Sequence, residues 1–201
     1  NGEIYNFREL RKNLEKNHKF YTNSDTEVIL HAYEEYGEDC VNHFNGMFAF
    51  AIWDTNKKKL FLARDRLGVK PLFYCNLNGN LMFSSEIKSI LQLEEIDRKL
   101  NLNALSQFLT YAYTIDGQTL FENIYELLPG QKLIYLFEDR TFKISNYWEL
   151  NLHKSNDTES LTIEKLEKHL KKSIKLRLES DAPVGALLSG GLDSSIMVAM
   201  L

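Results

Sequence analysis

The sequence lacks the features that mark several common classes of protein. It has only two cysteines, Cys40 and Cys75, which lie in apolar stretches without the spacing of metal ligands. We expect them to be core thiols of a reducing compartment rather than parts of a disulfide framework. No apolar run approaches the roughly 20 residues that span a membrane, and no signal peptide is recognisable. These absences predict a cytoplasmic protein that does not act at a membrane.

The sequence also has little net charge, only −4 over 201 residues, so the strongly basic surface typical of nucleic-acid-binding proteins is not expected. It contains no internal repeat and no low-complexity tract. Hydrophobic residues make up 44% and charged residues 26%, as in ordinary globular proteins. The composition therefore predicts a globular protein whose partners do not include nucleic acid.

Both ends of the sequence suggest an internal piece of a longer protein. It opens on Asn1 without an initiator methionine, and it stops at Leu201 within a predicted helix. A lone strand and half a helix cannot bury their apolar faces, so a second domain that ends there would be incomplete. We expect residues 1–150 to form one domain, the polar stretch 151–160 to be a linker, and residues 161–201 to begin a second domain.

A glycine-rich stretch near the end of the sequence carries the clearest chemical signal. The apolar residues 184–188 predict a short buried strand, and residues 196–201 predict the start of a helix. Gly190 and Gly191 lie between them. Glycines allow backbone N–H groups to approach a phosphate closely, and the N-terminus of a helix adds the positive end of a dipole. The stretch therefore predicts a phosphate-binding loop, unless it is a serine-rich turn that binds nothing.

The polar residues of this loop narrow the kind of phosphate site. No lysine follows the glycines, which excludes the G-x-x-x-x-G-K-[ST] loop of nucleoside triphosphatases. Residues 189–194 match S-G-G-x-D-S, which resembles the pyrophosphate-binding loop of ATP pyrophosphatases. Together with residues 180–185 it is similar to the first part of the synthetase domain in the glutamine-hydrolysing asparagine synthetase family. The resemblance implies ATP and Mg²⁺ as cofactors, with Asp193 on the metal and the ATP or pyrophosphate held by Leu188, Ser189, Gly190, Gly191, Asp193, Ser194 and Ser195.

Hydrophobic periodicity predicts an α+β fold for the first 150 residues. Helices are expected at 4–15, 24–36, 85–93 and 103–111, and a longer amphipathic helix at 161–179 in the second domain. Strands are expected at 47–53, 59–64, 72–76 and 81–84, forming an antiparallel meander, and at 131–137 and 141–146. Both faces of residues 48–53 are apolar, so we expect helices before and after the meander to cover both sides. Ser24 and Glu27 have the spacing of a capping box, and Gly37 should end the helix that begins there.

Four motifs in this region resemble the class II glutamine amidotransferase family, in that family's order. They are Asn1-Gly2-Glu3-Ile4-Tyr5-Asn6, Ser24-Asp25-Thr26-Glu27, the stretch from Arg64 to Tyr74 that begins Arg64-Asp65-Arg66, and Phe83-Ser84-Ser85-Glu86-Ile87-Lys88. The resemblance implies an N-terminal-nucleophile, αββα glutaminase-type domain with antiparallel sheets. The first strand–loop–helix of an α/β adenine-nucleotide domain would follow it. We expect the third and fourth motifs to serve the scaffold rather than the chemistry.

The resemblance also implies roles for individual residues. In the family, an N-terminal cysteine hydrolyses glutamine with its own α-amine as base, and the ammonia crosses to a second domain. Asn1 and Gly2 would donate hydrogen bonds to the oxyanion, Asn1 and Glu3 would hold the substrate, and Asp25 would pair with the α-ammonium group of glutamine. The residues alone leave blander alternatives open. Asn-Gly is above all a turn dipeptide, and a carboxylate such as Asp25 is favoured in any first helical turn.

The family's cysteine nucleophile and the arginine that grips the glutamine carboxylate should lie upstream of Asn1, so we expect this piece alone to be inactive. For the parent protein the resemblance implies ATP-dependent amidation of aspartate to asparagine, through an aspartyl-adenylate and with ammonia from glutamine. Glutamine, aspartate and ATP would be its small-molecule partners. The family often forms dimers, which leaves a homodimer open.

Two other functions remain open at this point. A related amidotransferase or an enzyme like β-lactam synthetase would act on another acid, because the acceptor pocket would lie beyond Leu201. A non-catalytic binding module would keep the glutaminase fold without its chemistry. The histidines show no metal-ligand spacing and are expected to be surface or core residues; they are His18, His31, His43, His153 and His169.

Overall fold

The computed structural model describes residues 1–180 and 183–201, which divide into two compact units, Asn1–Glu149 and Leu150–Leu201. Asp181 and Ala182, which belong to the stretch that precedes the glycine-rich loop, lie outside the described residues. Among the residues described, no helix combines the length and apolarity that crossing a membrane requires.

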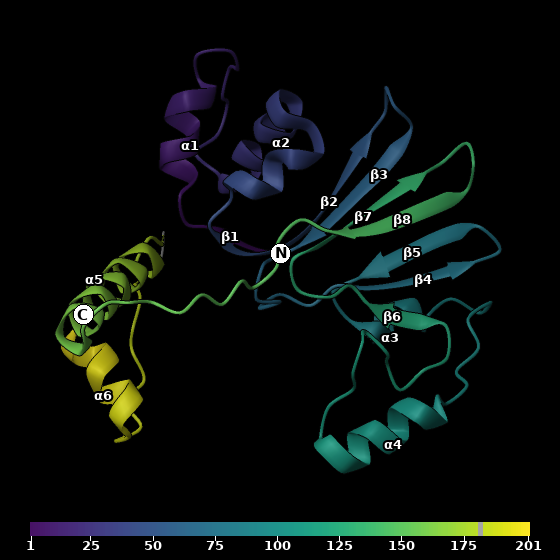
Figure 1. Cartoon of the computed structure of the whole chain (residues 1–201). Helices are drawn as coiled ribbons and strands as arrows, with labels where there is room; N and C mark the ends of the chain where they lie inside the picture. Colours follow the sequence, from purple (N-terminus) through teal and green to yellow (C-terminus); the bar gives the residue numbers. More distant parts are fainter. Residues whose placement is uncertain (181–182) are drawn as a thin grey trace. The chain divides into compact units, whose positions relative to one another are not determined.

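The first unit is built on two antiparallel sheets (Figure 1). The larger sheet has five strands, in the order β1 (Gly2–Ile4), β2 (Gly46–Asp54), β3 (Lys59–Arg64), β7 (Gln131–Leu136) and β8 (Thr141–Asn146). The smaller sheet has three, in the order β5 (Asn80–Ser84), β4 (Phe73–Leu77) and β6 (Ile124–Glu126). Every pair of neighbouring strands is antiparallel.

Helices cover the outer faces of the two sheets, which gives four layers in the order α, β, β, α (Figure 1). On the larger sheet lie α1 (Phe7–Leu14), α2 (Asp25–Tyr36) and the 3-10 helix η1 (Gly37–His43). On the smaller sheet lies α3 (Ile87–Ile90), and α4 (Leu102–Tyr111) follows it in the chain. The alternation of side chains along a strand explains the two apolar faces. In β3, Phe61 and Ala63 face the helices while Leu60 and Leu62 face the other sheet.

The expected single meander is wrong, and so is the expectation that helices cover both of its faces. β3 pairs with β7, and β4 begins the second sheet, which itself covers the inner face of the first. The strands β1 and β6 were not predicted because each has only three residues. Pairing between β3 and β7 joins segments far apart in the chain, so no local pattern in either strand reveals it.

Local features of the helices were predicted more closely. Ser24 caps α2, and Gly37 ends it with a φ of 61°. The capping box itself is wrong: the Ser24 hydroxyl accepts from the Thr26 N–H at 3.1 Å, and the Glu27 carboxylate reaches past Ser24 into the preceding loop. The helix expected at 85–93 shrinks to the four residues of α3.

In the second unit the structure has the helices α5 (Glu159–Arg177) and α6 (Leu192–Ala199). The strand expected at 184–188 is absent, and Leu187 is 96% exposed. A strand needs a neighbour to satisfy its backbone, and the described residues of this unit offer none. The helix after the loop starts at Leu192, four positions earlier than the sequence suggested, so Asp193, Ser194 and Ser195 belong to its first turn.

A buried carboxylate fixes the turn between the two sheets. Asp65 is 1% exposed, and its two oxygens accept hydrogen bonds from the backbone N–H groups of Phe48, Leu67, Val69 and Lys70 at 3.0–3.2 Å. A buried charge is tolerated only when its lone pairs are satisfied in this way. The carboxylate therefore ties the turn after β3 to the first half of β2.

The guanidinium group of Arg64 completes this turn. It donates to the carbonyl oxygens of Lys70 at 2.8 Å, Gly68 at 2.8 Å and Leu127 at 2.6 Å, and it forms an ion pair with Glu126 at 2.8 Å. Leu127 and Glu126 lie at the end of β6, so Arg64 joins the larger sheet to the smaller one. The sequence suggested only a general scaffold role for this motif.

We expect the substitution Asp65→Ala to lower the free energy of unfolding of the chain by about 3 kcal/mol or more, because it leaves buried backbone donors without an acceptor. Asp65→Asn keeps one acceptor oxygen and should lose less. Asp139→Ala, at an exposed position in the β7–β8 turn, should change the free energy by less than about 0.5 kcal/mol. Urea denaturation measures all three, and equal values for Asp65→Ala and Asp139→Ala would contradict this role of Asp65.

Candidate functional site

The first candidate site lies along the open edge of β1. Asn1 exchanges two backbone hydrogen bonds with Ala49 of β2: its N–H donates at 3.1 Å and its carbonyl accepts at 2.9 Å. A trans peptide holds the next N–H opposite to that carbonyl, and the chain has no cis peptide among its described residues. The Gly2 N–H therefore points away from β2. Because β1 is the outermost strand of its sheet, this donor faces the open side.

Glycine is required at position 2 by the fold itself. Gly2 has a φ of 128°, and a Cβ atom built there would lie 2.0 Å from the Met47 carbonyl oxygen. The partner strand shows the same close approach, since a Cβ atom on Gly46 would lie 2.1 Å from the Glu3 carbonyl oxygen. The family resemblance implied only that Gly2 donates a hydrogen bond to the oxyanion. The structure adds an independent reason, the contact between the backbones of β1 and β2.

Asp25 lies at the same open edge. It is the first residue of α2, it is half-buried, and its Oδ2 accepts a hydrogen bond from the Ile4 N–H at 2.9 Å. The Ile4 N–H, like that of Gly2, points away from β2. The carboxylate therefore sits two residues along the strand from the outward Gly2 donor, with the exposed Glu3 between them. The structure thus brings together the predicted residues Asn1, Gly2, Glu3 and Asp25.

One residue of this cluster was not predicted. The side-chain amide of Asn1 donates to the Ser85 hydroxyl at 3.3 Å. Ser85 belongs to the motif that the sequence suggested for the scaffold, and it lies between β5 and α3. The contact joins the two sheets at the edge where Gly2 and Asp25 lie. Its only signal in the sequence is the motif, because residues 1 and 85 are far apart in the chain.

The loop before Asp25 is held by a second carboxylate. Glu27 accepts hydrogen bonds from the Thr22 hydroxyl at 2.6 Å and from the N–H groups of Thr22 and Tyr21 at 2.7 Å. These bonds, with that of the Thr22 hydroxyl the strongest, lower the pKa of Glu27 from 4.5 to about 2. The carboxylate therefore stays ionised at neutral pH and fixes the path of the chain into α2. In this way Glu27 helps to position Asp25.

An open groove runs beside the start of α2. Thr22, Ser24 and Thr26 line one side, and residues 50–53 of β2 line the other. β1 pairs with Gly46, Met47 and Phe48, so among the described residues this half of β2 has no partner strand on the side of β1. The groove is thus an accessible hollow next to Asp25.

The two cysteines do not belong to this site. Both are buried and free, which confirms the expectation that they are core thiols. Burial raises the pKa of the Cys40 thiol to about 12 and also raises that of Cys75. A nucleophilic cysteine needs a thiolate near neutral pH, so neither residue suits that role.

The second candidate site is the glycine-rich loop at the start of α6. Gly190 has a φ of 81°, in the region that favours glycine, and Gly191 is the extended residue that precedes the helix. The N-cap residue of α6, Gly191, has no side chain that could cap the first turn. The first N–H groups of a helix have no partner within the helix, so they are free to bind an anion. Gly190 and Gly191 thus lie neither in a helix nor in a strand, as a phosphate-binding loop requires.

The serine hydroxyls close this loop on itself. Ser189 Oγ and Ser194 Oγ lie 2.9 Å apart, and the hydroxyls of Ser194 and Ser195 donate to the Gly191 carbonyl at 3.1 and 2.8 Å. All three side chains can turn outward to donate to phosphate oxygens. Asp193 is also in the first turn of α6, next to the same N–H groups. The sequence predicted Leu188 to be the last residue of a buried strand. In the structure it is 61% exposed and lies outside any strand.

Two known protein families match this chain, one over the region of the first candidate site and the other over the region of the second. The model of a glutamine amidotransferase domain matches residues 1–148. The model named asparagine synthase matches residues 165–201.

Individual relatives agree with these matches. A putative glutamine-hydrolysing asparagine synthetase 2 of Methanocaldococcus jannaschii is 42% identical, over 100% of this chain and 39% of that protein. The glutamine-hydrolysing asparagine synthetase 3 of Bacillus subtilis is 41% identical, over 100% of this chain and 33% of that protein. An amidase of Gibberella zeae, chry2, is 33% identical, over 100% of this chain and 30% of that protein. The chain thus spans only 30–39% of the length of these relatives.

Solved structures support the fold. The glutamine phosphoribosylpyrophosphate amidotransferase of Bacillus subtilis matches with a TM-score of 0.50 and 20% identity, over 99% of this chain and 42% of that one. A structure of the allosteric regulatory enzyme of purine biosynthesis matches with a TM-score of 0.51 and 20% identity, over 99% of this chain and 41% of that one. The expected glutaminase-type fold with antiparallel sheets is thereby confirmed.

We expect Gly2→Ala to detach β1 from β2, because the added Cβ would overlap the Met47 carbonyl. Hydrogen exchange of the Ala49 N–H, which donates to Asn1, should accelerate about tenfold or more. Gly37→Ala is the matched control, since Gly37 also has a positive φ but nothing lies within 4 Å of its Cβ position. It should leave that amide protected. Unchanged protection of Ala49 in Gly2→Ala would mean that the strand accommodates the side chain.

Proposed function

The chain belongs to the glutamine amidotransferase domain family, and from that premise we propose that the whole protein converts aspartate to asparagine, using ATP and ammonia released from glutamine. The observation that carries this proposal is the order of the two matched regions, a glutaminase-type unit followed by the start of an asparagine synthase region. The names of the relatives favour aspartate over another acceptor acid. Those at 37–42% identity are named asparagine synthetases, whereas those named amidases are 33% and 34% identical.

We propose that the edge of β1 holds glutamine and its oxyanion. Attack on the side-chain amide of glutamine places a negative charge on its carbonyl oxygen, which needs preorganised donors. The outward Gly2 N–H is one donor, and the Asn1 amide becomes the other when it turns from Ser85. Asp25 offers a carboxylate for the α-ammonium group, and the exposed Glu3 is placed to hold the substrate beside it.

The nucleophile is proposed to be a cysteine that these residues do not contain. Cys40 and Cys75 are buried, and burial raises the pKa of both thiols. In the family that the sequence resembles, the nucleophile is an N-terminal cysteine whose own α-amine takes up its proton. Ammonia leaves when the tetrahedral intermediate collapses to a thioester, and water then releases glutamate.

We propose that the loop at α6 binds the phosphates of ATP. The aspartate carboxylate attacks the α-phosphorus, the bond to the bridging oxygen breaks, and pyrophosphate leaves. Ammonia then displaces AMP from the aspartyl-adenylate. The free N–H groups of the first turn of α6 and the hydroxyls of Ser189, Ser194 and Ser195 would hold the pyrophosphate. Mg²⁺, bound by Asp193, would neutralise part of its charge.

The proposed function also bears on the cellular compartment in which the protein acts. Two free, buried cysteines and a reaction that consumes ATP suit the reducing cytoplasm, which we propose as the site of action. A homodimer stays a prediction from the family resemblance.

We expect Asp25→Asn in the whole protein to raise the KM for glutamine roughly 10–100-fold, because it removes a charged partner of the α-ammonium group. The amide keeps an oxygen that can accept from the Ile4 N–H, so β1 should stay in place. Synthesis from added ammonia should be unchanged. Asp139→Asn serves as a control with the same chemical change at an exposed position. A parallel loss of glutamine-dependent and ammonia-dependent synthesis would instead make Asp25 structural.

We expect Asp193→Ala in the whole protein to lower ATP–pyrophosphate exchange at least about 100-fold while glutamine hydrolysis continues. Asp193 would hold the Mg²⁺ that balances the charge of the leaving pyrophosphate. Glu164→Ala, on the exposed surface of α5, removes a carboxylate of the same unit and should affect neither reaction. Undiminished exchange in Asp193→Ala would remove the loop from the proposed ATP site.

A further inference from the structure

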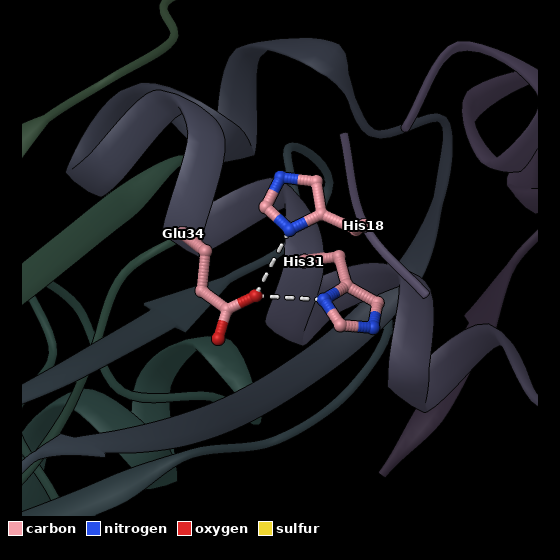
Figure 2. Close-up of side chains that lie close together, drawn as sticks. All are labelled: His18, His31 and Glu34. Carbon is pink, nitrogen blue, oxygen red and sulfur yellow. Dashed lines mark hydrogen bonds and ion pairs between the residues drawn. The ribbon is translucent and has the colours of Figure 1, made fainter. Parts of the chain in front are cut away.

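Two histidines for which the sequence showed no metal-ligand spacing lie side by side (Figure 2). His18 follows α1, and His31 lies in the middle of α2. Their ring centroids are 4.9 Å apart, and both rings reach the same oxygen of Glu34, which is on α2. The sequence showed no metal-ligand spacing for the histidines, and the structure brings this pair together from two separate segments. His31 and Glu34 have the i, i+3 spacing of one helix face, but His18 has no local signal.

The three donor atoms have nearly the spacing that a metal ion needs. Glu34 Oε2 is 3.3 Å from His18 Nδ1 and 2.7 Å from His31 Nδ1, and all three atoms lie within 4.8 Å of one another. A tetrahedral Zn²⁺ with bonds of about 2.0–2.1 Å keeps its ligand atoms about 3.3 Å apart. One distance already matches. The distance to His31 Nδ1 needs Glu34 to move outward by about 0.6 Å, which its half-exposed side chain allows. The ligand nitrogens of the two histidines lie within 4.8 Å of each other, so the rings also need to turn toward one another to reach this spacing.

A second shell of carboxylates faces the far nitrogens of both rings. His18 Nε2 lies 2.9 Å from Glu35 Oε2, and the Asn17 amide also donates to the Glu35 carboxylate. His31 Nε2 is buried, has no hydrogen-bond partner and lies 3.7 Å from Glu27 Oε1. Metal-binding histidines usually present their other ring nitrogen to a carboxylate, which fixes the ring and strengthens the ligand. His18 has that arrangement here, and Glu27 is the carboxylate that lies near the far nitrogen of His31, at 3.7 Å.

We propose that His18, His31 and Glu34 bind a divalent first-row transition metal, with Zn²⁺ as the reference ion and water in the fourth position. Two imidazole nitrogens and one carboxylate oxygen favour such an ion over Mg²⁺ or Ca²⁺, which prefer oxygen ligands. The side chains of His18 and His31 are only 16% and 12% exposed, while that of Glu34 is 48% exposed. The open position therefore lies on the solvent side of Glu34.

The metal would brace the loop that leads into Asp25. It would join His18, at the start of that loop, to His31 on α2, and Glu27 already links the loop to the same helix through Thr22. Asp25 lies about 9 Å along the helix from His31, at a rise of about 1.5 Å per residue. The ion would thus act on the structure around the glutamine site and not on the substrate. Its binding does not depend on the proposed function.

Zinc binding to the whole protein is measured against a chromophoric zinc indicator, with metal content after dialysis as a check. We expect tight binding in the unaltered protein and a rise in Kd of about tenfold or more in His18→Gln and in Glu34→Gln. His153→Gln, at an exposed position in the second unit, should bind as the unaltered protein does. Mg²⁺ and Ca²⁺ should not displace the zinc. Equal zinc affinity in the unaltered protein and in Glu34→Gln would overturn the site.

Hydrogen exchange tests the bracing separately. Zinc should slow the exchange of the Tyr21 and Thr22 N–H groups, which donate to Glu27, and should not do so in His18→Gln. Tight binding without slower exchange would overturn the structural role. If His18→Gln does not fold, Glu34→Gln replaces it, because its half-exposed side chain can change without disturbing the core.

Discussion

The fold of the first unit depends on the buried carboxylate of Asp65. Asp65 follows the last residue of β3 and makes two hydrogen bonds with Phe48. The Asp65 N–H donates to the Phe48 carbonyl, and the Phe48 N–H donates to the Asp65 carboxylate. The Asp65 carbonyl accepts from Gly130, just before β7. One residue thus ties the turn to β2 and to β7. Because Phe48 directs its backbone polar groups toward Asp65, its neighbours direct theirs to the other side, where Met47 lies opposite Glu3 of β1 and Ala49 bonds to Asn1.

This register determines what β1 can offer to a ligand. Asn1 uses its backbone groups on Ala49, so the Gly2 N–H is turned to the open edge of the sheet. The next outward donor, the Ile4 N–H, is taken by Asp25. A donor for an oxyanion and a carboxylate for an ammonium group therefore lie on the same edge, two residues apart. The same alternation of backbone groups that builds the sheet places both the N–H donor and the carboxylate that the proposed glutamine site needs.

The sequence predicts the parts of the fold that depend on local pattern. The bounds of β3 and β8 match the expected strands, and Ser24 and Gly37 start and end α2 as expected. Three contacts could not be predicted from local pattern: the pairing of β3 with β7, the hydrogen bond of Asn1 with Ser85, and the proximity of His18 and His31. Each joins residues from separate segments, and their positions depend on the packing of the whole unit. The predicted site residues were found through motifs, not through their contacts.

The loop at the start of α6 differs from the first unit in this respect, because its contacts are local and its geometry follows from the nearby sequence. The hydrogen bonds among its described residues join positions at most five apart. Gly190 and Ser194 therefore take up a loop-and-helix geometry although the preceding strand is absent. Its charge also has a local logic. Asp193 in the first turn interacts favourably with the helix dipole as long as no anion is bound. A pyrophosphate at the same N–H groups would be repelled by that carboxylate, so a cation between the two is needed for both to stay. On the proposed function, Asp193 would stabilise the helix through its dipole when no anion is bound, and would hold Mg²⁺ when pyrophosphate is bound.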